Sequence, residues 1–133
     1  MSSNTTSREV DILGMTNVLF ANADPKLIQL YHPYLTRHFF VDSANDGLTA
    51  LRKLKLTRPN VIISDYQLPR LSGLGLLKFV RSQENLAATP FIFFTNRLNI
   101  REALSFAAND WLNLSLTTPD LLIEKIYYHL KLN

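Results

Sequence analysis

The sequence VIISDYQLPRLSGLGLLKFVR, residues 61–81, joins a short apolar run to an amphipathic stretch through a loop that contains a proline. The run at residues 61–63 consists of branched apolar residues without polar alternation, as a strand that is covered on both faces requires. Asp65 follows this run, and the loop should keep its carboxylate near the surface. The segment therefore predicts a buried strand, an acidic turn and a helix.

Similar apolar runs occur in other parts of the chain, each followed by a polar turn and an amphipathic stretch. They are VLFA at 18–21, FFV at 39–41, FIFF at 91–94 and the weaker WLNL at 111–114. Parallel strands need a crossover between them, and the crossover is usually a helix. We therefore predict an α/β fold with a five-stranded parallel sheet and helices on both faces.

Capping and turn residues predict where the helices begin. Asp24 and Thr118 each precede a proline, whose missing N–H is harmless at the first helical position. Asp46 lies in an Asn-Asp-Gly turn after the second predicted strand. Pro33 removes a hydrogen bond inside the first helix, so we expect a kink or an early end there.

Composition excludes several classes of protein. The chain has 133 residues, a net charge of +3, 47% hydrophobic residues and no cysteine. We expect one domain at residues 17–133 after a flexible leader, residues 1–16, that is rich in Ser, Thr and Asn. Disulfides, thiolate catalysis and cysteine-ligated zinc are excluded. Because the sequence contains neither a signal peptide nor a long apolar run, we expect a cytoplasmic protein without a membrane partner.

Basic residues gather in one segment and raise the question of nucleic-acid binding. The cluster consists of Arg52, Lys53, Lys55 and Arg58. The same segment carries a stripe of leucines that should face the core: Leu48, Leu51, Leu54 and Leu56. The basic residues then form the solvated side of an amphipathic helix, and we expect no nucleic-acid partner.

Residues that follow the strands are the candidates for a functional site, because ligands of open parallel α/β sheets bind beyond the carboxyl ends of the strands. Asp65 is the most prominent of them. Taken alone, an aspartate in this position is equally well explained as a turn-forming residue. The other strand-end residues are Asn22, Ala23, Asp24, Ser64, Thr95, Asn96, Leu114 and Ser115.

The segment around Asp65 closely resembles the third strand, phosphoacceptor loop and third helix of bacterial response-regulator receiver domains. That pattern reads Asp, two residues, an apolar residue, Pro, two more residues and Asp-Gly. Asp65, Leu68, Pro69 and Gly73 are in register with it, and Ser72 replaces the acidic residue before the glycine. Weaker matches in the correct order extend the resemblance over about residues 17–130.

The resemblance implies a flavodoxin-like fold with strand order 2-1-3-4-5. It also implies that Asp65 receives a phosphoryl group from a histidine kinase and that Thr95 is the switch hydroxyl that contacts this group. Trp111 occupies the position of the mobile aromatic residue on the fifth strand. The implied partners are signalling proteins, either a histidine kinase or a downstream target.

The chain departs from the family pattern at the positions that assist the acceptor. Asn22 and Ala23 replace the two adjacent carboxylates that hold Mg²⁺, and Leu114 replaces the lysine that binds the phosphoryl group. Asp65 and Gln67 are the metal positions that remain. One carboxylate holds Mg²⁺ weakly or not at all, so we expect no cofactor beyond a weak or absent magnesium site.

We hypothesise a receiver-like module with a degenerate acceptor site, which is not an enzyme and acts mainly through protein–protein contacts. The alternative is a conventional response regulator that is phosphorylated on Asp65. Asp24 could then serve as a substitute acid, although its position before a proline is better explained as a helix cap. An enzyme of another class is a third hypothesis, which the sequence does not favour because it shows no Gly-rich phosphate loop and no nucleophile–base pair.

The same resemblance predicts a contact surface, or a homodimer interface, on the fourth helix, the fifth strand and the last helix. In that last helix, Leu122, Ile123, Ile126 and Leu130 can cover the sheet. Leu121, Tyr128 and Leu132 remain as an apolar stripe on another side. We expect Tyr128, with Trp111 nearby, to anchor a partner. Partly exposed aromatic residues without a partner explain this pattern equally well.

Overall fold

The computed structural model describes residues 16–97 and 100–131. Its strands are β1 (Asn17–Ala21), β2 (Phe40–Ala44), β3 (Val61–Ser64), β4 (Phe91–Thr95) and β5 (Asp110–Asn113). Its helices are α2 (Pro25–Leu35), α3 (Gly47–Thr57), α4 (Gly73–Ser82), α5 (Ile100–Ser105) and α6 (Pro119–Lys131). None of the helices in the described residues combines the length and hydropathy that crossing a membrane requires. Residues 1–15 of the predicted leader lie outside the described residues, and the carbonyl of Thr16 accepts a hydrogen bond from the N–H of Phe40.

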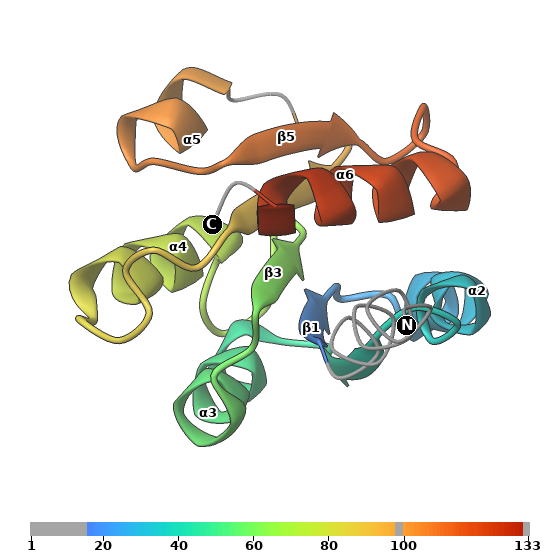
Figure 1. Cartoon of the computed structure of the whole chain (residues 1–133). Helices are drawn as coiled ribbons and strands as arrows, with labels where there is room; N and C mark the ends of the chain where they lie inside the picture. Colours follow the sequence, from blue (N-terminus) through green and yellow to red (C-terminus); the bar gives the residue numbers. More distant parts are fainter. Residues whose placement is uncertain (1–15, 98–99, 132–133) are drawn as a thin grey trace, which may run out of the picture.

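All neighbouring strands pair in parallel, in the order β2-β1-β3-β4-β5 (Figure 1). This result confirms the predicted flavodoxin-like α/β fold. Because the strands are parallel, their carboxyl ends lie at one edge of the sheet, where the predicted site residues follow them.

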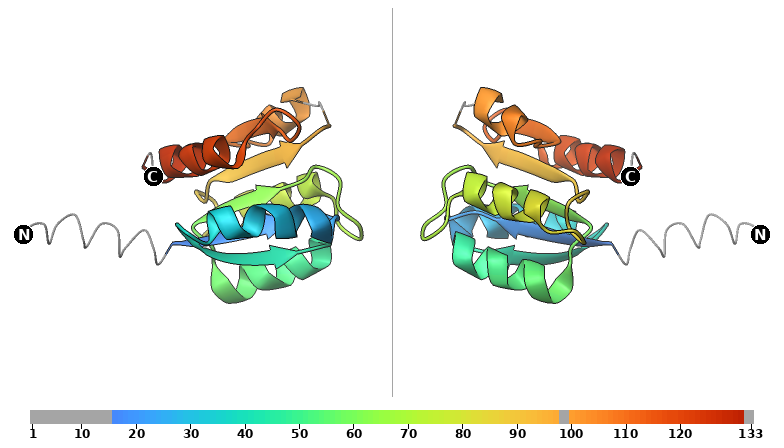
Figure 2. Two further views of the ribbon diagram at one scale, coloured as in Figure 1. Left: turned by 90° about the vertical axis from the view of Figure 1, so that its right-hand side faces the viewer. Right: turned by 90° about the vertical axis from the view of Figure 1, so that its left-hand side faces the viewer.

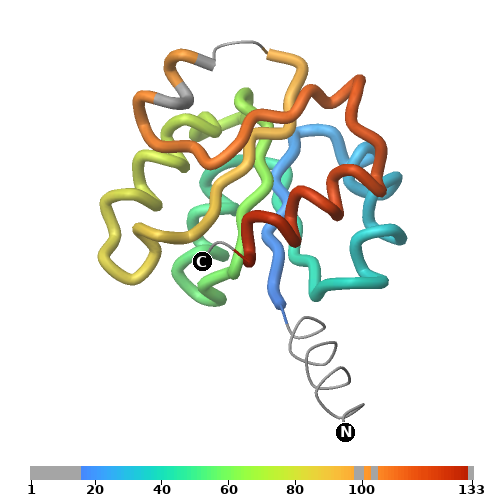
Figure 3. Tube along the Cα trace, turned by 45° about the horizontal axis from the view of Figure 1, so that its top comes forward, coloured from blue at the N-terminus to red at the C-terminus, as the bar shows by residue number. Residues whose placement is uncertain are grey.

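Helices cover both faces of the sheet (Figure 2). Helices α2 and α6 lie side by side on one face (Figure 3), and α3 and α4 cover the other. Alternate residues of β1 enter different cores, since Leu19 packs with α3 and α4 whereas Phe20 packs with α2 and α6. Both residues are fully buried, which explains why the run VLFA contains no polar residue.

Polar side chains begin four of the helices. Asp24, Asp46 and Ser72 accept hydrogen bonds from first-turn N–H groups of α2, α3 and α4 at 2.9, 2.8 and 3.0 Å. Thr118 Oγ1 accepts a hydrogen bond in the first turn of α6 at 3.2 Å. The capping predicted for Asp24 and Thr118 is therefore confirmed, and Ser72 is a cap as well.

The leucine stripe predicted in α3 is partly wrong. Leu54 is buried, but Leu48 and Leu56 are 38% and 76% exposed. The buried side of the helix consists of Gly47, Ala50 and Leu54. Small residues at positions 47 and 50 let α3 approach its neighbours closely, and this orientation turns Leu56 toward solvent.

Helix α2 continues through Pro33 and ends two residues later, at Leu35. Its last turn is closed by Thr36, whose N–H and hydroxyl both donate to the carbonyl of His32 at 2.9 Å. The helix therefore does not end at Pro33, and a kink at that residue stays a prediction.

Candidate functional site

The carboxyl ends of β1, β3 and β4 bring three of the predicted site residues together. Ala21 pairs with Ser64 in the sheet, so Asn22 and Asp65, which follow them, lie side by side. Thr95 is the last residue of β4 and reaches the same place. Asn22 and Thr95 are buried, whereas Asp65 is partly exposed. The carboxylate is therefore accessible from solvent.

Both carboxylate oxygens of Asp65 accept hydrogen bonds from the protein. Oδ1 accepts from the hydroxyl of Thr95 at 2.7 Å and from the N–H of Gln67 at 3.1 Å. Oδ2 accepts from Nδ2 of Asn22 at 3.3 Å. These bonds come from three different segments and hold the carboxylate in one orientation.

Contacts at both ends of the Asn22 side chain determine the orientation of its amide. Oδ1 accepts a hydrogen bond from the N–H of Asp24 at 2.9 Å, and Nδ2 donates to Asp65. Turning the amide over would place oxygen against the Asp65 carboxylate and NH₂ against the N–H of Asp24. Asn22 therefore presents a hydrogen-bond donor to Asp65. An aspartate at this position would instead present a carboxylate oxygen, which is an acceptor only, to the Asp65 carboxylate.

Thr95 connects Asp65 to the loop after β4. Its Oγ1 donates to Asp65 and accepts from the N–H of Arg97 at 3.1 Å. The guanidinium carbon of Arg97 lies 5.8 Å from the centre of the Tyr66 ring. Sequence reasoning did not identify Arg97, because nothing in its spacing distinguishes it from other surface arginines. Only the fold places it at the rim of the site.

The other predicted site positions bring no charged side chain to Asp65. Ala23 is exposed and apolar, and Gln67 contributes its backbone N–H. The side chain of Leu114 packs against the apolar cluster beneath α2 and α6. Leu114 therefore joins the core on that face of the sheet.

The loops after β4 and β5 are linked by side-chain bonds. The N–H and the hydroxyl of Ser115 both donate to Oδ1 of Asn96, at 3.1 and 2.9 Å. The N–H of Leu114 donates to the carbonyl of Thr95 at 3.1 Å. These bonds fix the segment that contains Leu114 next to the Thr95 loop.

Close packing at Gly73 shapes the loop that carries Asp65. A Cβ at position 73 would lie 2.1 Å from the carbonyl oxygen of Asp65, which no side chain tolerates without a backbone shift. The N–H of Gly73 also donates to the carbonyl of Tyr66 at 2.9 Å. A residue without a side chain is therefore required where the loop meets α4.

Residues 18–126 match the family described as the response regulator receiver domain. The chain belongs to this family. Among its relatives, chemotaxis protein CheY-3 of Vibrio cholerae is 33% identical over 92 residues, which cover 65% of this chain and 71% of that protein. Hybrid signal transduction histidine kinase D of Dictyostelium discoideum is 26% identical over 107 residues, which cover 78% of this chain but 7% of that protein.

Solved structures agree with this assignment. The chemotaxis response regulator CheY4 of Vibrio cholerae superposes with a TM-score of 0.79 and 28% identity, over 86% of this chain and 98% of that chain. Residues 18–126 thus form a receiver domain, the family to which the chemotaxis regulators of Vibrio cholerae are also similar.

In this receiver domain, the aromatic residue of β5, Trp111, packs next to the loop that follows Asp65. The ring of Trp111 lies 5.6 Å from that of Tyr66 and 5.2 Å from that of Phe93, between ring centres. Its indole Nε1 is buried and has no hydrogen-bond partner among the described residues. Because Tyr66 directly follows Asp65, this packing connects Trp111 to the loop that carries Asp65.

Trp111 on β5 and Tyr128 on α6 belong to different packing environments. Successive residues of β5 point to opposite faces, so Trp111 packs on the side of α3 and α4 whereas Leu112 packs beneath α6. Tyr128 projects outward from α6 and is 57% exposed. Leu121 is exposed as well, as predicted, and Leu132 lies outside the described residues. Trp111 and Tyr128 therefore do not pack against each other within one core cluster, and their role as an anchor for a partner stays a prediction.

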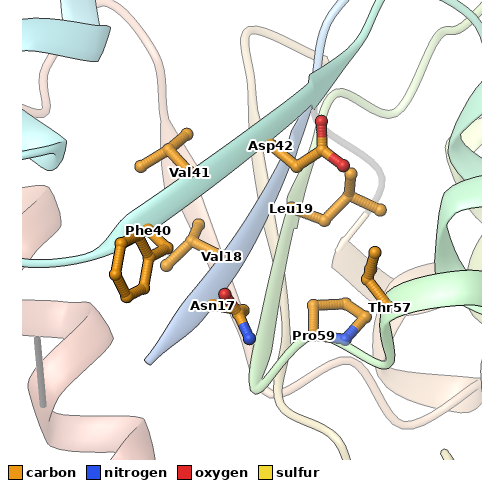
Figure 4. A pocket seen from close by; sticks show the side chains of 8 residues that line it. All are labelled: Asn17, Val18, Leu19, Phe40, Val41, Asp42, Thr57 and Pro59. Carbon is orange, nitrogen blue, oxygen red and sulfur yellow. The ribbon is translucent and has the colours of Figure 1, made fainter. Parts of the chain in front are cut away.

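A small hollow of about 180 Å³ lies at the opposite end of the receiver domain, where β1 and β2 begin (Figure 4). Asn17, Phe40 and Pro59 are among its lining residues, with Asp42 on one side. The Asp42 carboxylate is paired with Lys53 Nζ at 2.8 Å. The hollow is therefore separate from the predicted site residues. Lys53, a member of the predicted basic cluster, forms its ion pair within the domain.

Proposed function

We propose that this receiver domain has a degenerate acceptor site and transmits signals mainly by docking to a histidine kinase or a downstream target. The observation that carries the proposal is the hydrogen bond from Asn22 Nδ2 to Asp65 Oδ2, at 3.3 Å. This bond puts an N–H group where metal-dependent phosphoryl transfer needs a second acid. The domain then acts as a binding module in the cytoplasm and catalyses no reaction of its own.

The residues around Asp65 do not fit Mg²⁺, which prefers a near-octahedral shell of oxygen ligands and is held mainly by carboxylates. The side-chain oxygen of Asn22 is occupied by the N–H of Asp24, and Ala23 has no side-chain oxygen. The carboxylate of Asp24 caps α2. Among the described residues, no group of three or more His, Cys, Asp or Glu side chains could hold a metal ion.

The lack of a cationic side chain directed at Asp65 among the described residues is a second argument for a degenerate acceptor site. Phosphoryl transfer depends on positioning and on neutralising the charge of the transferred oxygens. Leu114, at the lysine position, packs into an apolar cluster. Arg97 lies over the ring of Tyr66. Neither arrangement aims a cation at Asp65.

A conventional acceptor site is the second candidate. The observation that favours it is the geometry of Asp65 itself, whose partly exposed carboxylate lies 2.7 Å from the hydroxyl of Thr95. In this alternative, Asp65 is phosphorylated by a histidine kinase, and the kinase or the donor brings the missing charge.

Labelling with acetyl phosphate and Mg²⁺ separates the two candidates. Transfer would form a bond between an Asp65 oxygen and phosphorus, break the bond from phosphorus to the acetate oxygen, and add about 80 Da to the intact mass. We expect the wild type to react at least about 100-fold more slowly than the variant Asn22→Asp/Ala23→Asp/Leu114→Lys, which regains both acids and the lysine.

The control is the same triple variant with Asp65→Ala, which should remain unlabelled. Rapid, Mg²⁺-dependent labelling of the wild type that Asp65→Ala abolishes would overturn the proposal and support a conventional response regulator. A triple variant that is folded, as judged by circular dichroism, but no more reactive than the wild type would also contradict it. The missing groups would then not be the reason for the low reactivity.

A further inference from the structure

A groove between the carboxyl-terminal ends of α3 and α4 has a volume of about 420 Å³. Its apolar lining consists of Leu54, Phe79 and Leu86, and two exposed basic residues, Lys55 and Arg58, line it as well. We call it the α3–α4 groove. It lies on the face of the sheet opposite α6, because its apolar residues belong to the core beneath α3 and α4.

Neither basic residue of the α3–α4 groove lies within ion-pair distance of an acidic side chain in the described part of the chain. Lys55 Nζ lies 5.6 Å from the centre of the Phe79 ring, at the apolar lining. Glu84 lines a neighbouring hollow together with Arg58, but the two side chains form no ion pair. The groove thus combines an apolar surface with two positive charges that no described acid neutralises.

The backbone of Arg58 supports a role for its side chain. Arg58 ends α3 in the left-handed region, with φ 46° and ψ 70°, and its N–H donates to the carbonyl of Leu54 at 3.2 Å. Glycine is the usual residue at this position after a helix, because a Cβ is unfavourable there. A strained position that carries a long cationic side chain at a groove is therefore a candidate contact residue.

The chain enters the domain next to this groove. The N–H of Asn60 donates to the carbonyl of Asn17 at 2.8 Å, and the N–H of Asn17 donates to Oδ1 of Asn60 at 2.8 Å. Asn60 lines the neighbouring hollow, which shares Arg58 and Asn85 with the α3–α4 groove. Strand β1 begins at the end of the molecule where α3 and α4 end (Figure 2). Residues 1–15, which lie outside the described residues, precede β1 at this end.

The leader contains a segment whose charge and hydropathy match the groove. Residues 9–13 read Glu-Val-Asp-Ile-Leu, so two acidic residues are interleaved with apolar ones. Asp11 precedes Thr16 by five residues, which span up to about 17 Å when extended. Arg58 and Asn60 are two residues apart, which is at most about 7 Å. The acidic segment is therefore long enough to reach the groove from the start of β1.

We propose that residues 9–13 bind in the α3–α4 groove of the same chain, so that their carboxylates neutralise Lys55 and Arg58. The apolar side chains of the segment then cover Phe79. The hollow where β1 and β2 begin is also near the leader, but among the described residues it is lined by the carboxylate of Asp42 and by no basic side chain. Its charge disfavours an acidic segment, so the charges select the α3–α4 groove.

A spin label on the leader tests this placement in the full chain. Because the chain has no cysteine, the variant Ser7→Cys carries a nitroxide at a single place. The nitroxide should broaden the amide NMR signal of Gln83, which lines the groove, more than that of Phe40. Phe40 is the matched reference, because its N–H donates to the carbonyl of Thr16, at the end of the leader. An unbound leader would broaden Phe40 at least as strongly as Gln83.

Charge exchange tests the contacts themselves. Lys55→Glu/Arg58→Glu should abolish the extra broadening of Gln83, because it places acidic residues on both sides of the contact. Glu9→Lys/Asp11→Lys should abolish it as well, because it places basic residues on both sides. Combining the four substitutions makes the charges opposite again and should restore the difference between the two signals.

Arg52→Glu, a charge reversal on the exposed surface of α3 outside the groove, is the matched control and should leave the broadening unchanged. Equal broadening of Gln83 and Phe40 in the otherwise wild-type chain overturns the proposal. So does a fourfold exchange that is folded, as judged by its amide spectrum, but does not restore the difference. Broadening of Gln83 in isotope-labelled chains mixed with spin-labelled ones would show binding between copies and would contradict binding within one chain.

These outcomes are independent of the acceptor site. None of the substitutions changes Asp65 or the residues that donate hydrogen bonds to it, so acetyl phosphate labelling of each variant should match that of the wild type. Rapid labelling of a chain with a bound leader would refute the degenerate site alone. Slow labelling of a chain with an unbound leader would refute the groove binding alone.

Discussion

At Asn22, the side chain has nearly the shape of an aspartate, but one of its terminal atoms carries protons where the acid has lone pairs. The amide oxygen keeps the bond to the N–H of Asp24, which an aspartate could also accept. The amide nitrogen donates to Asp65. One exchange of an oxygen for a nitrogen thus turns a repulsive neighbour of Asp65 into an attractive one.

The variant Asn22→Asp tests this polarity. Without a cation, two carboxylates about as close as the present 3.3 Å contact should lower the free energy of unfolding by about 2 kcal/mol. Adding Ala23→Asp and Mg²⁺ should recover most of this loss, because the two acids and Asp65 then share a divalent ion. Urea unfolding with Mg²⁺ and with EDTA measures both effects. If Mg²⁺ leaves the double variant unchanged, the explanation is wrong.

Gly73 is the second residue whose chemical identity determines the geometry of the site. Gly73→Ala should lower the free energy of unfolding by about 1–3 kcal/mol, because the new Cβ meets the carbonyl oxygen of Asp65 at 2.1 Å. Gly75→Ala, in the same helix, is the matched control. Its Cβ meets the flexible end of Leu71, and alanine favours helix by about 1 kcal/mol. Equal losses in the two variants, measured by urea unfolding, would contradict this account.

Among the elements, α3 begins in direct contact with the loop that follows Asp65. The N–H of Gly47 donates to the carbonyl of Pro69 at 3.0 Å. A Cβ at position 47 would lie 1.9 Å from the carbonyl oxygen of Leu71, so only glycine allows this approach. Asp46 caps the same end of the helix. The start of α3 and the loop after Asp65 therefore form one packed unit.

The cap of α3 should make stability depend on pH. The backbone N–H of Thr49, followed by its hydroxyl, lowers the pKa of the Asp46 carboxyl below its ordinary value of 3.8. Because the folded-state pKa is the lower one, the ionised carboxylate contributes stability above the unfolded-state pKa, and this contribution is lost as the pH falls through the folded-state pKa.

Asp46→Asn keeps a side-chain oxygen for the cap but removes the charge. We expect the wild type to unfold at a higher urea concentration than this variant at pH 7, with the difference shrinking at about pH 3. Asp120→Asn, in the first turn of α6, serves as a comparison on another helix. A difference between wild type and Asp46→Asn that stays constant over this pH range would show that the charge contributes nothing.

Over the whole molecule, Arg81 joins segments that are far apart in the sequence. From α4 its guanidinium donates to the carbonyls of Thr89, at 2.7 Å, and Ala107, at 3.0 Å. It also donates to Oδ1 of Asn109 at 2.7 Å, and the same oxygen accepts from the N–H of Phe91 at 2.8 Å. The segments that lead into β4 and β5 are therefore held together by one side chain.

Arg81→Met keeps much of the volume and removes all the donors, so it should lower the free energy of unfolding by about 2 kcal/mol. Arg81→Lys should recover less than half of that loss, because a single ammonium cannot reach acceptors in several directions. Arg52→Met, on an exposed part of α3, should leave urea unfolding unchanged. Full stability of Arg81→Met would show that the three segments do not need this link.

Local sequence determined where most strands and helices lie. A strand buried on both faces consists mostly of apolar residues, which made VLFA, VII and FIFF predictable. A helix start needs an acceptor for its free N–H groups, which made the caps Asp24 and Thr118 predictable. The family resemblance added the strand order and identified Asp65 and Thr95 as candidate site residues. In the structure, the hydroxyl of Thr95 lies 2.7 Å from Oδ1 of Asp65.

Other features depend on which distant residues meet, and only the tertiary structure decided them. The orientation of the Asn22 amide requires both Asp24 and Asp65 as neighbours. Trp111 and Tyr128 lie on opposite sides of the sheet because the pleat of β5 turns Trp111 toward α4 while α6 covers the other face. A residue pattern records the period of a helix or strand, but not the surface against which each side packs, because that depends on contacts between segments far apart in the chain.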